Sequence, residues 1–448
     1  MNPAIFREYD IRGVVGKDFD ESFARLLGRA FARVLKDHHG RKATLGRDCR
    51  LSSPSLTQAM IQGMVESGLE VTDVGIVTTP MLYFSLFHLK PDGGLQVSGS
   101  HNPPDQNGFK VCVGQETLYG EQIQHLREII EKQDFPSGQG SVKTYPLQQD
   151  YIKWLSENLK LARPLKVVVD AGNGTAGPVA PPILRNLGCR VTELYTEMDG
   201  RFPNHHPDPT VEKNVAELRE RVLQEKADCG IAYDGDADRI GVIDDKGGIL
   251  WGDILMIVLS RALLKDVPGA TVIGEVKCSH RLYNDIAAHG GKPIMWKAGH
   301  SLIKAKMRET GAQLGGEMSG HIFYQHRYFG FDDAIYTSCR LLEILSRSKQ
   351  KLSEMLADVP MTYSTPEIRI NSSDERKFQI VDQAVKFFGA QYKTVTVDGV
   401  RVVFPDGWGL VRASNTQPML VMRFEAESEK RLNEIRNLIE SKINELNR

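Results

Sequence analysis

The stretch KVVVDAGNGTAGPVAPPILRNLGCRVTELY, residues 166–195, decides the fold. The apolar run at 166–170 is typical of a buried strand, a Gly-rich turn follows it, and apolar residues at helical spacing then lead to Gly188. A glycine at that point suits the left-handed residue that ends many helices, and a second strand follows. The stretch therefore predicts a strand, a turn, a helix and a second strand, in that order.

The same order of elements occurs twice more, at residues 43–75 and 271–296, where Gly68 and Gly290 mark the helix ends. Each of the three units is followed by a strand, a polar loop and another strand. These loops are SGSHNPPDQNG at 98–108, DGDADR at 234–239 and GGEMSGH at 315–321. Such units in series predict α/β domains with helices packed on largely parallel sheets, whose sites gather at loops leaving the strand ends.

After about residue 360 the pattern changes to a strand, a helix at 375–388, short strands and a final amphipathic helix at 427–446. This order predicts a smaller α+β domain. A chain of 448 residues is also too long for one hydrophobic core. We therefore expect four domains, with residues 1–146, 147–248, 249–359 and 360–448.

The composition limits the class of protein. The 57 acidic side chains nearly cancel the 56 basic ones, so we expect neither a nucleic-acid partner nor a membrane surface as partner. The N-terminus lacks the apolar segment of a secretory signal, and six scattered cysteines without a C-x-x-C pair fit reduced thiols better than disulfides or zinc ligands. We expect a cytoplasmic protein.

The loop DGDADR offers a metal site. Asp234, Asp236 and Asp238 occupy alternate positions of what we expect to be an extended loop, so all three carboxylates face one way. Three clustered carboxylates repel one another unless a cation neutralises them, and hard oxygen ligands suit Mg²⁺. An EF-hand is a poor match, because Arg239 stands where that loop needs glycine and Asp245 where it needs glutamate. A solvated acidic turn is the alternative.

Two further loops offer groups that bind an organic phosphate. VRASNTQP, residues 411–418, combines a guanidinium, hydroxyls, an amide and successive backbone N–H groups, and the side chains are those of Arg412, Ser414, Asn415 and Thr416. In GGEMSGH, the polar side chains of Glu317, Ser319 and His321 stand two residues apart, which suits the hydroxyls of a sugar. An ordinary polar turn is the alternative for each loop. The chain has no P-loop motif for a nucleotide phosphate.

Ser100 is the candidate nucleophile. His101 follows it, but neighbouring side chains on an extended segment point to opposite faces, so we do not expect a Ser-His dyad. The chain also lacks a G-x-S-x-G elbow. A serine held in a turn near carboxylate-bound Mg²⁺ suits phosphoryl transfer, because the metal and nearby basic groups offset the charge on the phosphoryl oxygens. The alternative is a serine that only caps a turn.

Taken together, these loops resemble the α-D-phosphohexomutase superfamily, and most closely its bacterial phosphomannomutase/phosphoglucomutase branch. The resemblance spans nearly the whole chain, in the family's order. Its motifs are YDIRG at 9–13, GRDCRLSSP at 46–54, GSHNPPDQNGFK at 99–110, DAGNGTAG at 170–177, DGDADR, GEMSGH and RASNTQP. YDIRG and GEMSGH favour the glucose/mannose branch over the phosphoglucosamine branch. Gln417 departs from the residues that many relatives carry at this position.

The resemblance implies an α/β fold of four domains around a central cleft, the first three alike and the fourth a smaller α+β domain. It implies that Ser100 is the phosphoserine and that an oxygen of its phosphate binds Mg²⁺ with Asp234, Asp236 and Asp238. Sugar hydroxyls would be held by Glu317 and Ser319, and the unreacting phosphate by Arg412, Ser414, Asn415 and Thr416. The pocket would be lined by Tyr9, Arg12, Lys277, His300 and His321. Near the transferring group would lie Arg12, His101, Lys110 and Arg239.

The implied activity is the reversible interconversion of hexose 1-phosphate and hexose 6-phosphate, of mannose, glucose or both, through a hexose 1,6-bisphosphate that is also the activator. The partners would be small sugar phosphates, and we expect a monomer rather than an obligate oligomer. His101, Lys110, Arg12 and His321 are candidates for acid–base work, although an arginine that stays protonated suits charge stabilisation better. The alternatives are a phosphoglucosamine mutase, a metal-dependent sugar phosphatase and a non-catalytic sugar-phosphate-binding protein.

Overall fold

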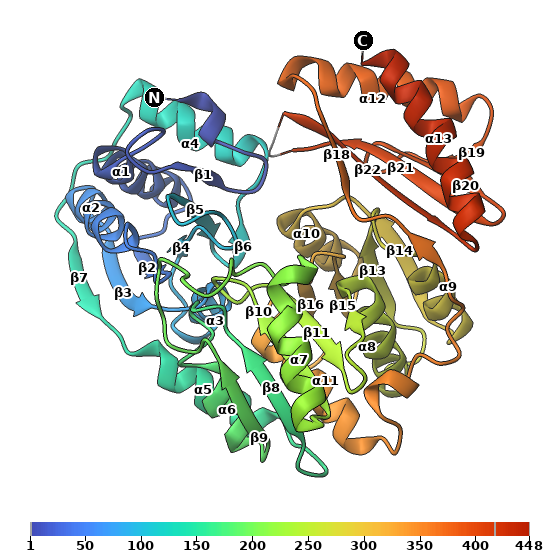
Figure 1. The fold of residues 1–448 in the computed structure, drawn as a ribbon. Helices are drawn as coiled ribbons and strands as arrows, with labels where there is room; N and C mark the ends of the chain where they lie inside the picture. Colours follow the sequence, from blue (N-terminus) through green and yellow to red (C-terminus); the bar gives the residue numbers. More distant parts are fainter. Residues whose placement is uncertain (1, 416–417, 448) are drawn as a thin grey trace.

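The chain forms four β-sheets in sequence order, each with its own helices. The computed structural model describes residues 2–415 and 418–447. We call each sheet with its helices a unit, numbered first to fourth along the chain. In Figure 1 the first unit lies at the left and the fourth at the upper right, with the second and third between and below them.

The first unit holds a seven-stranded sheet in the order β1-β5-β4-β2-β3-β7, with β6 paired to β5. Its strands are β1 (Ile11–Val14), β2 (Lys42–Arg47), β3 (Glu70–Ile76), β4 (Gly93–Val97), β5 (Gln106–Val113), β6 (Glu116–Thr117) and β7 (Ser141–Thr144). Its helices are η1 (Pro3–Ile5), α1 (Glu21–Asp37), α2 (Ser53–Glu66), α3 (Thr79–His88) and α4 (Glu121–Lys132). Strand β2 runs parallel to β3 and β4, whereas β5 is antiparallel to β1 and β4.

The second and third units repeat this plan on smaller sheets, in the orders β12-β11-β10-β8-β9 and β14-β13-β15-β16. The second holds α5 (Leu147–Asn158), β8 (Lys166–Asp170), α6 (Ala180–Asn186), β9 (Arg190–Leu194), η2 (Glu212–Val215), α7 (Ala216–Glu225), β10 (Cys229–Tyr233), β11 (Ile240–Asp244) and β12 (Ile249–Leu250). The third holds α8 (Gly252–Asp266), β13 (Thr271–Glu275), α9 (His280–Ala288), β14 (Lys292–Trp296), α10 (His300–Thr310), β15 (Leu314–Gly316), β16 (Ile322–Tyr324), α11 (Ala334–Arg347) and η3 (Leu352–Glu354).

The fourth unit is an antiparallel sheet in the order β17-β22-β21-β20-β19, with β18 also paired to β22. Its elements are β17 (Tyr363–Ser364), β18 (Ile368–Asn371), α12 (Asp374–Gly389), β19 (Lys393–Val395), β20 (Val400–Phe404), β21 (Gly407–Ala413), β22 (Met419–Ala426) and α13 (Glu429–Leu446). Figure 1 shows both helices on the outer face of the sheet. The expected α+β architecture of the last part of the chain is confirmed.

The three repeats expected from the sequence are present as β2-α2-β3, β8-α6-β9 and β13-α9-β14, and the two strands of each repeat pair in parallel. Gly68, Gly188 and Gly290 have φ angles of +92°, +95° and +79°. Each takes the left-handed conformation just after its helix, which costs glycine nothing and would strain any residue with a Cβ.

The apolar core joins the second and third units and reaches into the first through α3, whose residues 79–86 are all buried. The first and fourth units each have a further cluster of their own. A small cluster of Val276, Trp408 and Leu410 lies where the third unit meets the fourth. Among the described residues, none of the helices is both long and apolar enough to cross a bilayer.

Candidate functional site

Loops from all four units line one cleft of about 810 Å³. They are the β4–β5 loop, the β10–β11 loop, the β15–β16 loop and the end of β21. The lining includes these candidates from the sequence: Tyr9, Arg12, Ser100, His101, Lys110, Asp238, Arg239, Lys277, His300, Glu317, Ser319, His321, Arg412, Ser414 and Asn415. Asp234 and Asp236 are fully buried beside it, whereas Thr416 and Gln417 lie outside the described residues.

Ser100 sits in a turn rather than on an extended segment. Its φ of +47° is in the left-handed region, which bends the chain at this residue. Its Oγ donates to Oδ2 of Asp234 at 2.7 Å and lies 3.1 Å from Nδ1 of His101. The expectation that Ser100 and His101 point to opposite faces is therefore wrong, because the turn brings the two side chains together.

The side chain of Arg50 binds the backbone of the loop that carries Ser100. Arg50 is 1% exposed and its Nε donates to Asp48 at 3.1 Å. Its two terminal nitrogens donate to the carbonyl oxygens of Ser100 (2.7 Å), Asn102 (2.6 Å), Pro103 (2.5 Å) and Gln106 (3.0 Å). A planar guanidinium thus binds four carbonyls of one turn, and this fixes the backbone that carries Ser100.

The three aspartates of DGDADR are all buried, and carboxylate oxygens from each lie within 4.8 Å of one another. The loop is a tight turn with Ala237 at a φ of +61°, so the expected extended conformation is wrong although the carboxylates do converge. Oδ2 of Asp236 accepts from Thr79 and Ser98, but its Oδ1 is buried without a hydrogen-bond partner among the described residues. A free buried carboxylate oxygen within an all-oxygen set fits Mg²⁺.

Lys110 on β5 partly neutralises this cluster. Its Nζ contacts Asp238 and lies 3.3 Å from Asp236. Burial opposes the charge of Lys110, but the two carboxylates raise its pKa above the ordinary value, so it stays an ammonium ion. Burial and the neighbouring Asp238 and Asp236 raise the pKa of Asp234. The three carboxylates therefore crowd one another at the place where a divalent cation would bind, and Lys110 is in contact with two of them.

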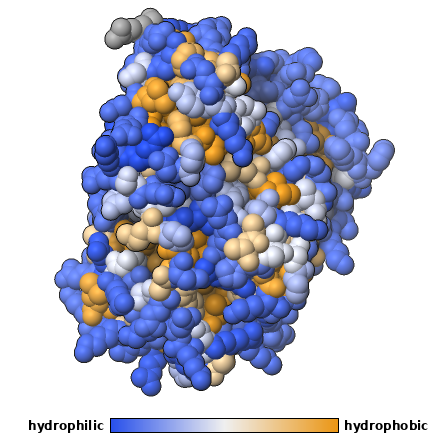
Figure 2. All heavy atoms as spheres, turned by 90° about the vertical axis from the view of Figure 1, so that its right-hand side faces the viewer, coloured by the Kyte–Doolittle hydropathy of each residue, from blue (hydrophilic) through white to orange (hydrophobic). Residues whose placement is uncertain are grey.

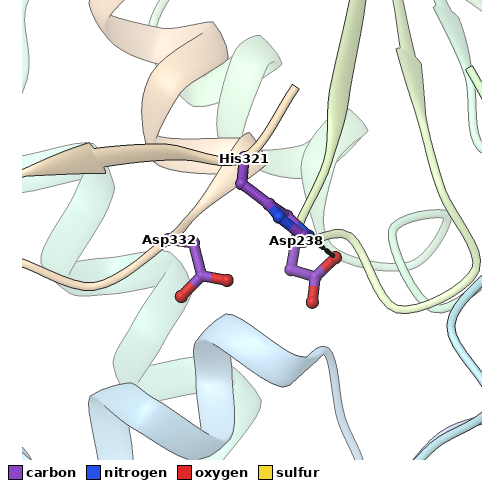
Figure 3. Close-up of side chains that lie close together, drawn as sticks. All are labelled: Asp238, His321 and Asp332. Atoms are coloured by element: carbon purple, nitrogen blue, oxygen red, sulfur yellow. Dashed lines mark hydrogen bonds and ion pairs between the residues drawn. The ribbon is translucent and has the colours of Figure 1, made fainter. Parts of the chain in front are cut away.

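Asp238, His321 and Asp332 form a second cluster of possible metal ligands (Figure 3). The imidazole is directed at Asp238, with 3.2 Å between Nε2 and Oδ1. Lys304 lies 3.1 Å from Asp332, and Lys110 contacts Asp238, so ammonium groups already neutralise both carboxylates. We therefore interpret this cluster as an ion-pair network. Burial opposes protonation of His321, but Asp238 raises its pKa to about 9, so it carries a proton at neutral pH.

The β15–β16 loop presents Glu317 in a fixed orientation. Its carboxylate accepts from the backbone N–H of Gly299 at 2.7 Å and from Nδ1 of His321 at 2.6 Å. Gly320 has a φ of +93°, and a Cβ there would come within 2.3 Å of the carbonyl oxygen of Ile240. The loop thus packs directly against β11, next to the aspartate loop, with Ser319 half-buried in the cleft.

The fourth unit meets the first and third at Tyr9. The Tyr9 hydroxyl donates to the carbonyl of Ala298 at 2.6 Å and accepts from Nδ2 of Asn415 at 2.5 Å. Nε of Arg412 donates to Asp398 at 3.0 Å, and this carboxylate also accepts from the N–H of Ala298. These bonds set the phosphate-binding candidates at one wall of the cleft, and among the described residues no hydrogen bond occupies the terminal nitrogens of Arg412.

Further polar side chains line the cleft that sequence reasoning missed: Asp10, His206, Asp208, Glu367, Arg369 and Arg423. The segment FPNHHPDP, residues 202–209, could have indicated His206 and Asp208 as site residues, because it concentrates two histidines and an aspartate between prolines. Asp10 directly precedes the strand of Arg12 and pairs with that side chain. Arg423 stands in an ordinary strand pattern and gave no such signal.

Comparison with known families gives four consecutive matches. All four carry the description phosphoglucomutase/phosphomannomutase: alpha/beta/alpha domain I matches residues 3–137, domain II matches 149–248, domain III matches 251–363 and the C-terminal domain matches 367–442. The four matches follow the order of the four sheets, as the resemblance implied.

Curated relatives and solved structures agree with these matches. A phosphomannomutase/phosphoglucomutase of Pseudomonas aeruginosa is 48% identical over 98% of this chain and 95% of its own length, and a phosphoglucomutase of Neisseria meningitidis is 45% identical over 98% and 96%. A phosphoglucomutase/phosphomannomutase family protein of Burkholderia thailandensis superposes with a TM-score of 0.93 at 42% identity, covering 100% of this chain and 98% of that one. The chain therefore belongs to the phosphoglucomutase/phosphomannomutase family of the α-D-phosphohexomutase superfamily.

Proposed function

We propose that this protein is a phosphohexomutase that interconverts hexose 1-phosphates and hexose 6-phosphates of glucose, mannose or both. The observation that carries the proposal is the contact of Ser100 Oγ with Asp234, 2.7 Å long, inside a buried carboxylate cluster that opens to the same cleft as Arg412. One site thus offers a nucleophilic oxygen, and a remote wall offers a cationic fork for a second phosphate.

Asp234, Asp236 and Asp238 would hold Mg²⁺ together with an oxygen of the Ser100 phosphate, and the ion would supply Lewis-acid stabilisation of the phosphoryl oxygens. Lys110 remains charged beside Asp238 and adds fixed positive charge to the same side. Its raised pKa favours charge stabilisation over a role as general base.

In the first half-reaction, the free sugar hydroxyl attacks the phosphorus on Ser100, and the bond from phosphorus to Oγ breaks. Burial, with Arg239 and Arg12 nearby, lowers the pKa of His101, so its imidazole is neutral and can accept the hydroxyl proton. Nδ1 of His101 lies 3.1 Å from Oγ, so the imidazole can take up the hydroxyl proton on its other ring nitrogen and give a proton from Nδ1 to the serine oxygen that leaves. The products are a hexose 1,6-bisphosphate and a free serine, and proton and phosphoryl group are both accounted for.

The bisphosphate then turns around in the cleft and returns its other phosphate to Ser100. Arg412, Ser414, Asn415 and Thr416 would hold whichever phosphate is not reacting, while Glu317 and Ser319 would hold the hydroxyls common to both orientations. Tyr9, Arg12, Lys277, His300 and His321 would line the path, and Arg239 would face the transferring group. Exclusion of water during this step protects the phosphoserine, and closure of the last domain would serve that end.

We propose domain boundaries after residues 146, 248 and 359. Each domain then contributes one loop, and these loops carry the phosphoserine, the metal ligands, the sugar contacts and the phosphate contacts in that order. We further propose a monomer, because loops of all four units meet in one cleft, so the proposed chemistry calls for no residue of a second copy. On the face that Figure 2 shows, hydrophobic side chains lie in groups among hydrophilic ones. A cytoplasmic location fits the six cysteines, which are all free thiols.

The test is a substrate panel of glucose, mannose, N-acetylglucosamine and glucosamine 1-phosphates, assayed with Mg²⁺ and the matching 1,6-bisphosphate. We expect rapid formation of the 6-phosphates of glucose, mannose or both, and loss of that activity in Ser100→Ala. Release of inorganic phosphate instead would indicate a phosphatase. Tight binding without turnover would indicate a sugar-phosphate-binding protein, and preference for the amino sugars would indicate a phosphoglucosamine mutase.

A further inference from the structure

Side chains of the fourth unit form hydrogen bonds with the backbone of a loop in the third unit. The loop joins the end of β13 to the start of α9 and carries Lys277, which lines the cleft. Arg401 on β20 donates through Nη1 to the carbonyl oxygens of Val276 at 2.5 Å and Cys278 at 2.8 Å. Its Nη2 lies 2.6 Å from Nδ1 of His280. One guanidinium therefore fixes the loop on both sides of Lys277.

Two residues of β22 form further hydrogen bonds with the same loop. Nη1 of Arg423 donates to the carbonyl of Lys277 and lies 3.3 Å from Asp253. Oε1 of Glu425 accepts from Ser279 Oγ at 3.0 Å and from the N–H of His280 at 3.2 Å. The loop therefore contacts the fourth unit at each residue from Val276 to His280, which leaves its backbone little freedom of its own.

Trp408 on β21 holds Arg401 in place. The guanidinium carbon lies 3.5 Å from the centre of the indole ring, and the indole N–H donates to Glu425 at 3.1 Å. Both side chains are almost fully buried. Cation–π contact contributes most when the cation is desolvated, as here. Trp408 also belongs to one apolar cluster with Val276, the first residue of the loop.

The chemistry of Arg401 is unusual for a buried arginine. Among the described residues it forms no salt bridge to a carboxylate, and burial lowers its pKa to about 10. Its partners are two carbonyls and the imidazole of His280, whose pKa burial lowers to about 4, so that the ring is a neutral acceptor. What this buried guanidinium provides is the geometry of its planar fork, which joins two carbonyls and one imidazole at once.

The side chain of Lys277 depends on that geometry. Its Nζ lies 3.2 Å from Glu367 and 3.5 Å from Glu275. Oε1 of Glu275 in turn accepts from the N–H of Met318 in the β15–β16 loop. The ammonium group thus sits between the β17–β18 segment of the fourth unit and the loop of Glu317. A shift of the Val276–Cys278 backbone by a fraction of an ångström would move it relative to both.

We propose that Arg401 and Trp408 are positioning residues, through which the fourth unit sets the place of Lys277 in the cleft. Neither touches the cleft itself, so both act through the loop backbone. This inference rests on the proposed function in one respect, that Lys277 contacts the sugar phosphate. A misplaced binding group costs up to about 10²-fold in rate or affinity, so the effect is measurable.

The test is a double-mutant cycle on ligand binding, made in the Ser100→Ala protein so that no turnover occurs. Isothermal calorimetry gives the Kd for glucose 1-phosphate in that protein and with Arg401→Lys, Lys277→Met or both changes added. Lysine keeps the charge over Trp408 but cannot reach both carbonyls and the imidazole. The matched control is Arg431→Lys, which alters a cation 5.1 Å from the ring of Phe404 on the same sheet, while its hydrogen bonds to described residues go to Asp406 and Glu434 and not to the loop.

We expect Arg401→Lys to weaken binding about tenfold when Lys277 is present and less than about twofold in the Lys277→Met background, because the two changes remove one function. Arg431→Lys should leave Kd unchanged. Equal effects of Arg401→Lys in both backgrounds, or a lower melting temperature with unchanged Kd, would overturn the proposal.

Trp408→Phe keeps an aromatic face and gives a second, milder variant should Arg401→Lys not fold. We expect the same pattern from it, a weaker Kd that depends on Lys277. Mutase turnover of the protein with Ser100 intact is measured separately. If the effect of Arg401→Lys on Kd depends on Lys277 but the enzyme shows no turnover, the positioning role holds and the mutase proposal is refuted. If the enzyme turns over but the effect on Kd does not depend on Lys277, the mutase proposal holds and the positioning role is refuted.

Discussion

Replacing Arg50 by lysine should release the turn that presents Ser100. The arginine is buried, and its guanidinium bonds to four carbonyl oxygens of the turn and to Asp48. Lysine has three donors on one atom, so it can satisfy at most three of these five acceptors. At least two carbonyl oxygens lose their bond from a charged donor.

Each hydrogen bond to a charged group contributes about 1.5–3 kcal/mol, so two lost bonds remove about 3 kcal/mol or more of local stability. Since 1.4 kcal/mol corresponds to tenfold in an equilibrium, the turn should open about 10² times more often. The ion pair with Asp48 persists in this variant, which avoids the larger penalty of an unpaired buried carboxylate.

Hydrogen exchange followed by mass spectrometry measures this opening directly. The amides of Gly99, Ser100, Asn102 and Gln106 are all hydrogen-bonded within this region, so peptides covering 98–108 should lose protection in Arg50→Lys. The matched control is Arg201→Lys, since that arginine is 73% exposed in its pair with Asp199 and should matter little.

We expect Arg50→Lys to have this local effect together with at least a tenfold fall in mutase turnover, because the nucleophile loses its fixed position. Unchanged exchange at 98–108 with normal turnover would refute it. Faster exchange throughout the first sheet would show instead that Arg50 supports the whole unit and not this turn in particular.

Three further predictions concern the metal loop and stability. A Cβ at Gly235 would lie 2.5 Å from the Ser100 carbonyl, so Gly235→Ala should lower turnover at least about tenfold, whereas Gly389→Ala, with its nearest neighbour at 3.8 Å, should not. Mg²⁺ at 100 times its Kd should stabilise the fold by about 2.7 kcal/mol, seen as a higher melting temperature that chelation reverses and Asp236→Asn abolishes. Burial raises the pKa of Asp333 from 3.8 to about 6, so the native state binds more protons between these values and stability falls as pH rises through that window; Asp333→Asn should flatten melting temperature against pH there.

Each of these outcomes can fail in a recognisable way. Full turnover in Gly235→Ala would mean that the two loops tolerate separation. A melting temperature indifferent to Mg²⁺, or an equal Mg²⁺ response in Asp236→Asn, would argue against the carboxylate site. A pH profile of Asp333→Asn parallel to that of the unchanged protein would show that this carboxyl titrates alike in the folded and unfolded states.

Much of the fold followed from local patterns. Strand runs, helical spacing and the glycines at 68, 188 and 290 each act over a few residues, so the three repeats were predictable without any knowledge of distant contacts. The acidic loop was predictable for the same reason, since carboxylates on one short turn converge whether the turn is extended or tight. The conformation of that turn was not, because it depends on Ala237 adopting a positive φ under tertiary packing.

The supports of the site were harder to predict, because they join residues far apart in the chain. Arg50 and the carbonyl of Ser100 are 50 positions apart, and Tyr9 and Asn415 are 406 apart. No spacing rule connects such pairs. The same holds for Arg401, which looks like an ordinary strand residue until the third and fourth units are packed together.

The central claim is that the phosphate of Ser100 moves to the substrate and is replaced by the substrate's own. Its most direct measurement starts from enzyme labelled with ³²P at Ser100 and follows one turnover with unlabelled glucose 1-phosphate. We expect the label to appear in the bisphosphate and then in glucose 6-phosphate, while intact mass shows that Ser100 is still phosphorylated. Label that remains on the protein through turnover, or leaves as inorganic phosphate, would contradict it.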